Sequence, residues 1–325
     1  MSAACGGGRP AADRVIAVRD LVKRYRGATA NAVDGVSFTV EAGKFFALLG
    51  PNGAGKTTTI SILTTTLAPT GGEVRVDGHD LRRDAPAVRR SAGIIFQRPS
   101  LDQNLTGEEN VRFHAVLYGL FPWRPAYSLM PAGYRKEVRT LAEVLRIEEA
   151  IFRPVRTLSG GMRRKLEIVR SLLHRPRVLF LDEPTSGLDV ASRRDLWDHL
   201  ATVRRESGTT ILLTTHYLEE AEQADEICII DHGRVVAAGT PSEVKARLVQ
   251  EYVLVDADDR AALVGELGRL GITCSEGEHV RIPLAGRSTH TLLRSIETPL
   301  TYVETHSPSL EDAYLEVIGA GKEES

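Results

Sequence analysis

The chain has 325 residues, of which 42% are hydrophobic, which is enough for about two domains with a substantial core. Its 41 Lys and Arg residues nearly balance 43 Asp and Glu residues, and the net charge of −2 argues against a general nucleic-acid-binding protein. Three widely separated cysteines form neither a disulfide framework nor a metal-ligand spacing, as is typical of a reducing cytosol. No secretory signal and no apolar run of about 18 residues is present, so we expect any membrane role to come through a partner.

Residues 1–13 are small, Gly-rich and polar, and we expect them to be disordered. Strands are expected over 15–18 and 33–40, with Tyr25 between them. An exposed tyrosine there could stack on a nucleotide base, or it could pack on the edge of the sheet. These residues alone favour neither interpretation.

A phosphate-binding loop is predicted between a strand over 44–49 and a helix over 58–63. The segment from Gly50 to Thr57 matches G-x-x-x-x-G-K-[ST], whose glycines let backbone N–H groups surround an anion at a helix N-terminus. Lys56 would hold the outer phosphates and Thr57 would bind magnesium. The nucleotide-binding residues expected here are Gly50, Asn52, Gly53, Gly55, Lys56, Thr57 and Thr58.

A buried strand over 92–97 ends in Gln97, which an open α/β sheet would direct into the ligand crevice. Gln97 could sense magnesium and the attacking water, or it could be an ordinary loop residue. The chain is expected to be helical from 105 to about 173, beginning with the capping pattern from Thr106 to Glu109. The proline-rich stretch 121–131 interrupts these helices, either as a partner-contacting excursion or as a small separate core.

A second anion-binding geometry follows, because Ser159, Gly160 and Gly161 stand directly before a helix. The basic run 163–165 on that helix, like the pairs at 82–83 and 89–90, is expected to be a solvated surface.

Two carboxylates, Asp182 and Glu183, end a buried strand over 178–182. Asp182 suits a magnesium-associated role, and Glu183 suits a general base acting on water. Asp189 lies in the turn to the next helix. His216 ends a further strand over 211–216, where it could contact a γ-phosphate or be structural.

Taken together, these motifs resemble those of an ATP-binding cassette (ABC) ATPase subunit over about 15–241. In that resemblance 50–57 is Walker A, Gln97 the Q-loop residue, 158–162 the signature and 178–182 Walker B. Glu183 is the catalytic base, 186–189 the D-loop with Asp189, His216 the switch histidine and Tyr25 the adenine-stacking aromatic. Met162 stands where the signature usually has glutamine, which leaves the expected Ser159 and glycine contacts in place.

The resemblance implies an α/β P-loop NTPase fold, with a RecA-like core, an antiparallel β subdomain and a helical subdomain over about 98–173. It also implies ATP and Mg²⁺ as cofactors, the latter held by Thr57, Gln97 and Asp182. Each ATP would lie between two copies of the chain in a homodimer, with Ser159, Gly160, Gly161 and Asp189 contributed across the interface.

Several segments narrow the resemblance to daunorubicin-resistance-type exporter ATPases: 97–102, 104–106, 160–164 and 308–314. Such a subunit would sit at the cytoplasmic face of the membrane and drive a separate permease of the second ABC exporter type. After the cassette (14–241), residues 242–320 predict a small accessory α/β domain, ferredoxin-like in its alternation, with 321–325 as a tail. Its final helix would be capped at 307–308, and a stabilising or dimer-supporting role is expected.

Two other functions fit parts of this pattern. One is a soluble ABC ATPase acting on nucleic acid or ribosomes, which the single cassette, the lack of paired cysteines and the absence of a long inserted arm disfavour. The other is an importer ATPase with a regulatory tail, which fits the architecture but not the subfamily segments. We therefore expect no nucleic-acid partner.

Overall fold

The computed structural model describes residues 14–97, 100–248, 251–284, 286–306 and 309–314. The segments 1–13 and 321–325, for which we expected disorder and a tail, lie outside this range, as does the expected helix cap at 307–308. The chain forms two compact units, Met1–Ala238 and Gly239–Ser325, where we expected a boundary after residue 241. Each unit is described by itself below.

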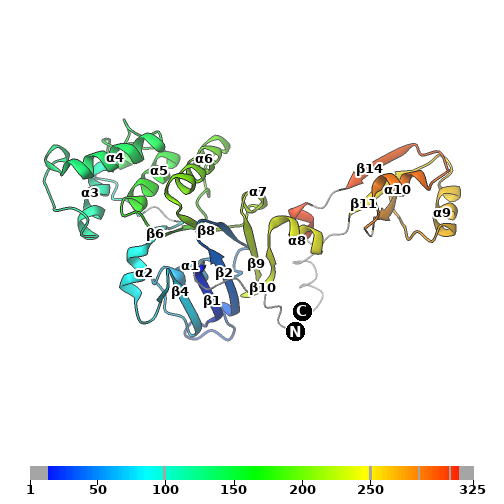
Figure 1. The fold of residues 1–325 in the computed structure, drawn as a ribbon, viewed down its shortest axis with the longest axis horizontal. Helices are drawn as coiled ribbons and strands as arrows, with labels where there is room; N and C mark the ends of the chain where they lie inside the picture. The colour runs from blue at the N-terminus through cyan, green and yellow to red at the C-terminus, as the bar shows by residue number, and fades with distance from the viewer. Residues whose placement is uncertain (1–13, 98–99, 249–250, 285, 307–308, 315–325) are drawn as a thin grey trace. The chain divides into compact units, whose positions relative to one another are not determined.

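A six-stranded sheet in the order β10-β9-β3-β8-β7-β6 is the centre of the first unit (Figure 1). Its strands are β3 (Phe45–Leu49), β6 (Ala92–Ile95), β7 (Val178–Asp182), β8 (Thr210–Thr215), β9 (Glu226–Asp231) and β10 (Arg234–Gly239). The pairs β3/β8, β3/β9, β7/β8 and β6/β7 are parallel. Every residue of β3, β7 and β8 is buried, as in parallel strands that are covered on both faces.

The register of this sheet fixes where the polar strand ends meet. Leu49 at the end of β3 pairs with Thr215, and Asp182 at the end of β7 pairs with Thr214. The segments that follow β3, β7 and β8 therefore leave the sheet at one edge, where ligands bind in open α/β sheets.

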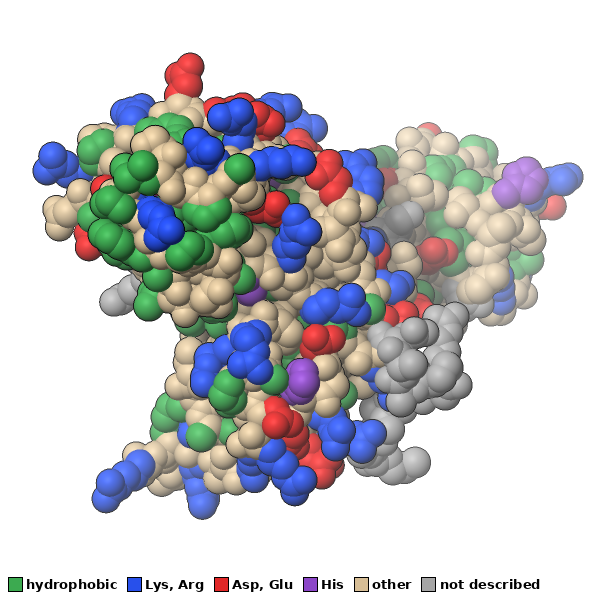
Figure 2. Space-filling model, turned by 60° about the vertical axis from the view of Figure 1, so that its left-hand side comes forward, with side chains coloured by type: hydrophobic (Ala, Val, Ile, Leu, Met, Phe, Trp, Pro, Cys, Tyr) green, Lys and Arg blue, Asp and Glu red, His purple; other side chains and the backbone are tan. Residues whose placement is uncertain are grey.

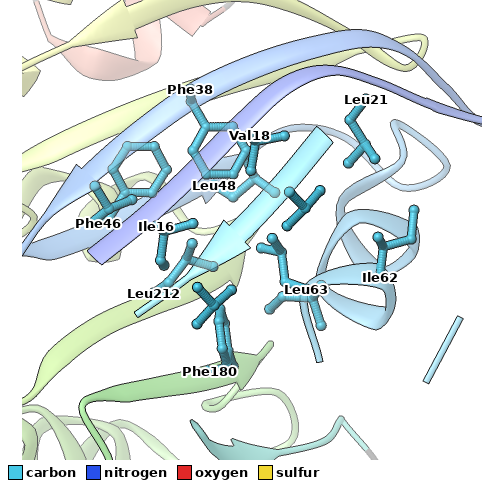
Figure 3. Close-up of a cluster of buried hydrophobic side chains, with 14 of the residues drawn as sticks. Ile16, Val18, Leu21, Phe38, Phe46, Leu48, Ile62, Leu63, Phe180 and Leu212 are labelled. Atoms are coloured by element: carbon cyan, nitrogen blue, oxygen red, sulfur yellow. The ribbon is translucent and has the colours of Figure 1, made fainter. Parts of the chain in front are cut away.

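An antiparallel sheet in the order β2-β1-β4-β5 shares its core with the six-stranded sheet. Its strands are β1 (Arg14–Lys23), β2 (Val33–Glu41), β4 (Gly71–Val76) and β5 (His79–Asp80). Figure 3 shows the ring of Phe38 from β2 against that of Phe46 from β3, and the ring centroids are 5.1 Å apart. Because both rings are buried, each contributes about 1.5–3 kcal/mol from burial alone, which holds the two sheets together.

The helical part of the first unit separates β6 from β7 in the chain (Figure 1). Its helices are α3 (Gly107–Leu117), η2 (Tyr127–Leu129), α4 (Ala132–Val144), η3 (Val155–Thr157) and α5 (Gly160–Leu172). The expected capping pattern is confirmed, since Thr106 and Glu109 form a reciprocal capping box at the start of α3. The remaining helices are α1 (Lys56–Leu63), α2 (Ala85–Ser91), α6 (Val190–Ser207) and α7 (Leu218–Glu222).

The stretch 121–131 is partly a small core and partly exposed. Phe121 and Tyr127 pack edge-on against the fully buried ring of Tyr134, and Met130 is buried beside them in the chain. Trp123 and Leu129, by contrast, are 54% and 58% exposed. The small core is thus confirmed for part of the stretch, and contact of its exposed residues with a partner stays a prediction.

The second unit begins with α8 (Pro241–Leu248) and contains a four-stranded sheet in the order β12-β13-β11-β14. Its elements follow the β-α-β-β-α-β order of the ferredoxin-like motif, as expected: β11 (Tyr252–Asp256), α9 (Arg260–Arg269), β12 (Ser275–Glu276), β13 (Val280–Pro283), α10 (Thr289–Arg294) and β14 (Tyr302–His306). Ten buried apolar residues, among them Val253, Leu263 and Ile282, form its own core. Within the described part of the whole chain, no helix is both long and apolar enough to cross a membrane.

Candidate active site

The loop after β3 requires glycine at several positions. A Cβ on Gly50 would collide with the carbonyl of Ile230, and one on Gly55 with the carbonyl of Ala32. Gly55 also has φ +104° and Gly53 has φ +84°, values that favour glycine. Gly55 precedes α1 and offers no side-chain cap, so the first amides of the helix are available to an anion.

Lys56 is the first residue of α1 and is only 4% exposed. Its Nζ donates to the carbonyl oxygens of Gly50 at 2.7 Å and Pro51 at 2.9 Å, which hold it across the loop. Burial lowers the pKa of the Lys56 ammonium, while the carboxylates of Glu183 and Asp182 oppose that shift. A phosphate is a stronger acceptor than a carbonyl, so Lys56 is placed to bind one.

Three oxygen-bearing side chains meet at the end of β7. Asp182 Oδ1 accepts from Thr214 Oγ1 at 2.6 Å and from Thr57 Oγ1 at 3.3 Å. Burial raises the pKa of Asp182, and the hydrogen bond from Thr214 counteracts this. A carboxylate and a hydroxyl are hard oxygen ligands of the kind that Mg²⁺ prefers, so Thr57 and Asp182 fit the magnesium role predicted for them.

Gln97, Glu183 and His216 come together at the same edge of the sheet. Gln97 Nε2 donates to Glu183 Oε2 at 2.9 Å, and His216 Nδ1 lies 3.4 Å from Glu183 Oε1. Glu183 has φ +43°, which few non-glycine residues adopt, and its N–H is held by the carbonyl and hydroxyl of Thr214. Strained backbone of this kind is often found at active sites.

Tyr25 follows β1 and lies beside the start of α1. Its hydroxyl is 3.2 Å from Thr58 Oγ1, and its side chain is 46% exposed, with Lys23 Nζ 5.6 Å from the ring centroid. Both interpretations, base stacking and packing on the edge of the sheet, fit a tyrosine that is 46% exposed. Base stacking by Tyr25 stays a prediction.

The predicted signature residues and Asp189 form a separate group. Ser159 caps α5 by accepting from Met162 N at 3.2 Å, as the sequence suggested. Asp189 caps α6 through Ser192 N and Oγ, and a Cβ on Gly161 would lie only 2.9 Å from that same Ser192 Oγ. No hydrogen bond or ion pair of the described residues joins Ser159 or Asp189 to Lys56.

Sequence reasoning missed Arg164. The expectation of a solvated basic run at 163–165 is wrong for Arg164 and also for Lys165, whose side chain is 12% exposed and pairs with Asp195. Arg164 is 6% exposed and donates to the carbonyls of Phe96, Asp182 and Pro184 and to Glu167. Thr214 was also missed. A threonine at the end of a strand beside a predicted acidic site could have indicated it, whereas the charge run around Arg164 concealed its burial.

Comparison with known proteins agrees with this geometry. The ABC transporter family description matches residues 33–186. The chain is 44% identical to a daunorubicin/doxorubicin resistance ATP-binding protein of Streptomyces peucetius, over 78% of this chain and 76% of the relative. It is 38% identical to a Nod factor export ATP-binding protein of Ralstonia nicotianae, over 94% of both chains. A solved dimeric ATP-binding cassette with bound ADP and Pi is similar at 25% identity and a TM-score of 0.61, over 69% of this chain and 98% of that one.

Proposed function

Since this chain belongs to the ABC transporter family as an ATP-binding, ATP-hydrolysing subunit, we propose that it powers export through a separate membrane-spanning permease. The observation that carries the ATPase part is the convergence of Gln97, Glu183 and His216 on the edge of the sheet that also bears Lys56 and Asp182. Nucleotide hydrolysis needs these parts: an anion cradle, metal ligands and a base placed where water can attack.

The residues divide the chemistry between them. The amides after Gly50 and the Lys56 ammonium bind and orient the β- and γ-phosphates. Thr57 and Asp182 would hold Mg²⁺, with Gln97 near it, and the ion when bound neutralises phosphate charge. Glu183 orients or deprotonates the attacking water, and His216 is close enough to Glu183 to fix that carboxylate and to steady the γ-phosphate.

We infer that the working unit is a homodimer. Ser159 and Asp189 lie on two segments that meet at Ser192. Among the described residues, neither is joined by a hydrogen bond or ion pair to Lys56 in the phosphate loop of its own chain. A second copy can bring these groups to the ATP, and a related cassette has been solved as a dimer with ADP and Pi. The second unit would support this dimer.

The exporter assignment is favoured by the two relatives named above, one a drug-resistance and one an export protein. It is also favoured by apolar side chains that Figure 2 shows gathered on the helical part of the first unit. Leu117 is 83% exposed, and Phe113 and Trp123 are 43% and 54% exposed. We propose that this surface receives a permease of the second ABC exporter type at the cytoplasmic face of the membrane.

The test has two parts. Purified chain should release phosphate from MgATP, and Lys56→Ala should lose most of this activity; equal rates would contradict the assignment of the site. The neighbouring reading frames are then searched for a six-span membrane protein, and co-expression with such a protein should bring the chain into the membrane fraction.

Leu117→Asp should release the chain from that fraction, whereas the control Val236→Asp, at a residue 42% exposed on β10, should not. Sedimentation that is independent of the membrane protein would contradict the exporter assignment.

A further inference from the structure

Arg164, in the second turn of α5, joins three segments that carry different functional groups. Its guanidinium donates to the Phe96 carbonyl at 2.6 Å, the Pro184 carbonyl at 2.9 Å and the Asp182 carbonyl at 3.2 Å. Its remaining partner is Glu167 Oε2 at 3.0 Å. Arg164 and Glu167 are 6% and 0% exposed, so these bonds lie in a region from which water is largely excluded.

The carbonyls that Arg164 binds are next to the reactive side chains. Asp182 and Pro184 flank Glu183, whose backbone has the strained φ of +43°, and Phe96 immediately precedes Gln97. One buried side chain thus sets the spacing between the backbones of Gln97 and Glu183. Their side chains are then 2.9 Å apart.

The same face of α5 also binds Ser100, three residues after Gln97 in the chain. Glu167 Oε1 accepts from Ser100 N at 2.8 Å, and Arg170 donates to the Ser100 carbonyl at 2.9 Å and hydroxyl at 2.6 Å. Residues 164, 167 and 170 are spaced by three, which places them along one side of the helix. A movement of α5 therefore acts on both described ends of the segment that carries Gln97.

Ser159, the N-cap of α5, is at the other end of this connection. Ser159 and Arg164 are five positions apart, a rise of about 7–8 Å along the helix, and a single helix over this distance moves as a unit. We propose that Arg164 is a positioning residue: it transmits engagement of Ser159 with the partner subunit's ATP to Glu183 and Gln97 in its own subunit. This inference rests on the proposed homodimeric ATPase.

ATP bound at one of the two hydrolysis sites thereby affects the positions of Glu183 and Gln97 at the other site. The physical basis is the rigidity of α5. The helix has the phosphate-contacting Ser159 at its N-terminus, and about one turn later it has Arg164, which holds the backbone on both sides of Glu183. The alternative is that Arg164 only fastens α5 to the sheet. That role would alter stability but would not link the effect of Arg164 to that of Ser159.

A double-mutant cycle separates these roles. Ser159→Ala, Arg164→Gln and the double variant are compared in steady-state phosphate release over a range of ATP concentrations. Arg164→Gln should lower kcat by about 10²-fold, the scale of a small misplacement of reacting groups, with KM within about threefold of wild type. Ser159→Ala should lower kcat at least about tenfold by itself, yet by less than about twofold in the Arg164→Gln background.

The matched control is Arg175→Gln, which breaks an ion pair with Glu137 just beyond α5 and involves a side chain that is 78% exposed. Its kcat should equal that of wild type, and in its background Ser159→Ala should keep its full effect. Additive effects of Ser159→Ala and Arg164→Gln would overturn the proposal. So would a rise in KM with unchanged kcat.

Arg164→Gln leaves Glu167 without its buried cation, so thermal unfolding is measured for each variant. Arg164→Lys retains the charge, but the lysine ammonium lacks the planar guanidinium that donates to several carbonyls at once. This variant should show the same non-additivity with Ser159→Ala, with a smaller loss of kcat. If both variants fail to fold, Arg164 is purely structural and the proposal is wrong. If the wild type itself lacks Lys56-dependent turnover, it is the proposed function that fails.

Discussion

Gln97 and Glu183 are 86 positions apart in the chain, yet Gln97 Nε2 donates to Glu183 Oε2 at 2.9 Å. The amide thereby fixes one carboxylate oxygen, while the other faces His216 Nδ1 at 3.4 Å. The hydrogen bond from Gln97 limits rotation of the Glu183 carboxylate, which favours one orientation of an attacking water. Glu183 is therefore the most informative residue to change.

Glu183→Gln should bind MgATP but hydrolyse it about 10²–10⁴-fold more slowly, because glutamine keeps the shape of glutamate but cannot take a proton. Loss of a carboxylate also relieves repulsion against the γ-phosphate, so the variant should accumulate as a closed homodimer. Light scattering behind a sizing column, with and without MgATP, measures this. Adding Ser159→Arg should abolish the dimer; a monomer at saturating MgATP and high protein concentration would contradict the composite site.

Tyr25→Ala should weaken ATP binding with a smaller loss of maximal turnover. Base stacking on an aromatic ring is worth about 1–3 kcal/mol, and it acts far from the reacting phosphate, so it contributes equally to ground and transition states. Titration with a fluorescent ATP analogue gives the affinity. Tyr25→Trp should retain it, and equal affinities for Tyr25→Ala and wild type would reject the stacking role.

Thr214→Val should raise the Mg²⁺ concentration needed for half-maximal turnover by about 10–100-fold, the usual cost of losing a residue that orients a metal ligand. Valine has the shape of threonine but cannot donate to Asp182 Oδ1. Since that hydrogen bond lowers the pKa of Asp182, its loss should also move the acid limb of the pH–rate profile to higher pH. An unchanged magnesium dependence would show that Thr214 only supports the strand.

Protonation of His114 should couple stability to pH. Its ring stacks on Tyr118, and burial, with smaller effects from Arg170 and His174, lowers the pKa of His114 to about 3 from an ordinary value of 6.5. Below pH 6.5 His114 takes up a proton in the unfolded chain but stays neutral in the folded chain. The free energy of unfolding should therefore fall steadily from pH 6.5 toward pH 3.

His114→Gln should make this decline shallower in urea unfolding at pH 7.5, 6.0 and 5.0. Part of the decline should remain, because burial also lowers the pKa of His174. His232→Asn is the control, since the His232 side chain is 88% exposed and asparagine tolerates its φ of +45°. Identical slopes for His114→Gln and wild type would contradict the assignment.

Local patterns predicted the strand ends and helix starts that build the site, since a phosphate loop or a capped glycine pair depends on neighbouring residues. The partners of Glu183 were predicted for the same reason, each as the polar end of a buried strand. Arg164 could not be found in this way. Arg163, Arg164 and Lys165 are alike in local sequence, and only the packing of α5 against β7 and the residues around Gln97 decides how deeply each side chain is buried.

The ferredoxin-like unit closes its own core around Val253, Leu263 and Ile282, and its strands pair only with one another among the described residues. Its folding information is therefore contained in residues 239–325, much as in an independently encoded module. Evolution could exchange such a module between cassettes without redesigning the catalytic sheet. A limited proteolytic cut near residue 239 should accordingly leave two fragments that each resist further digestion.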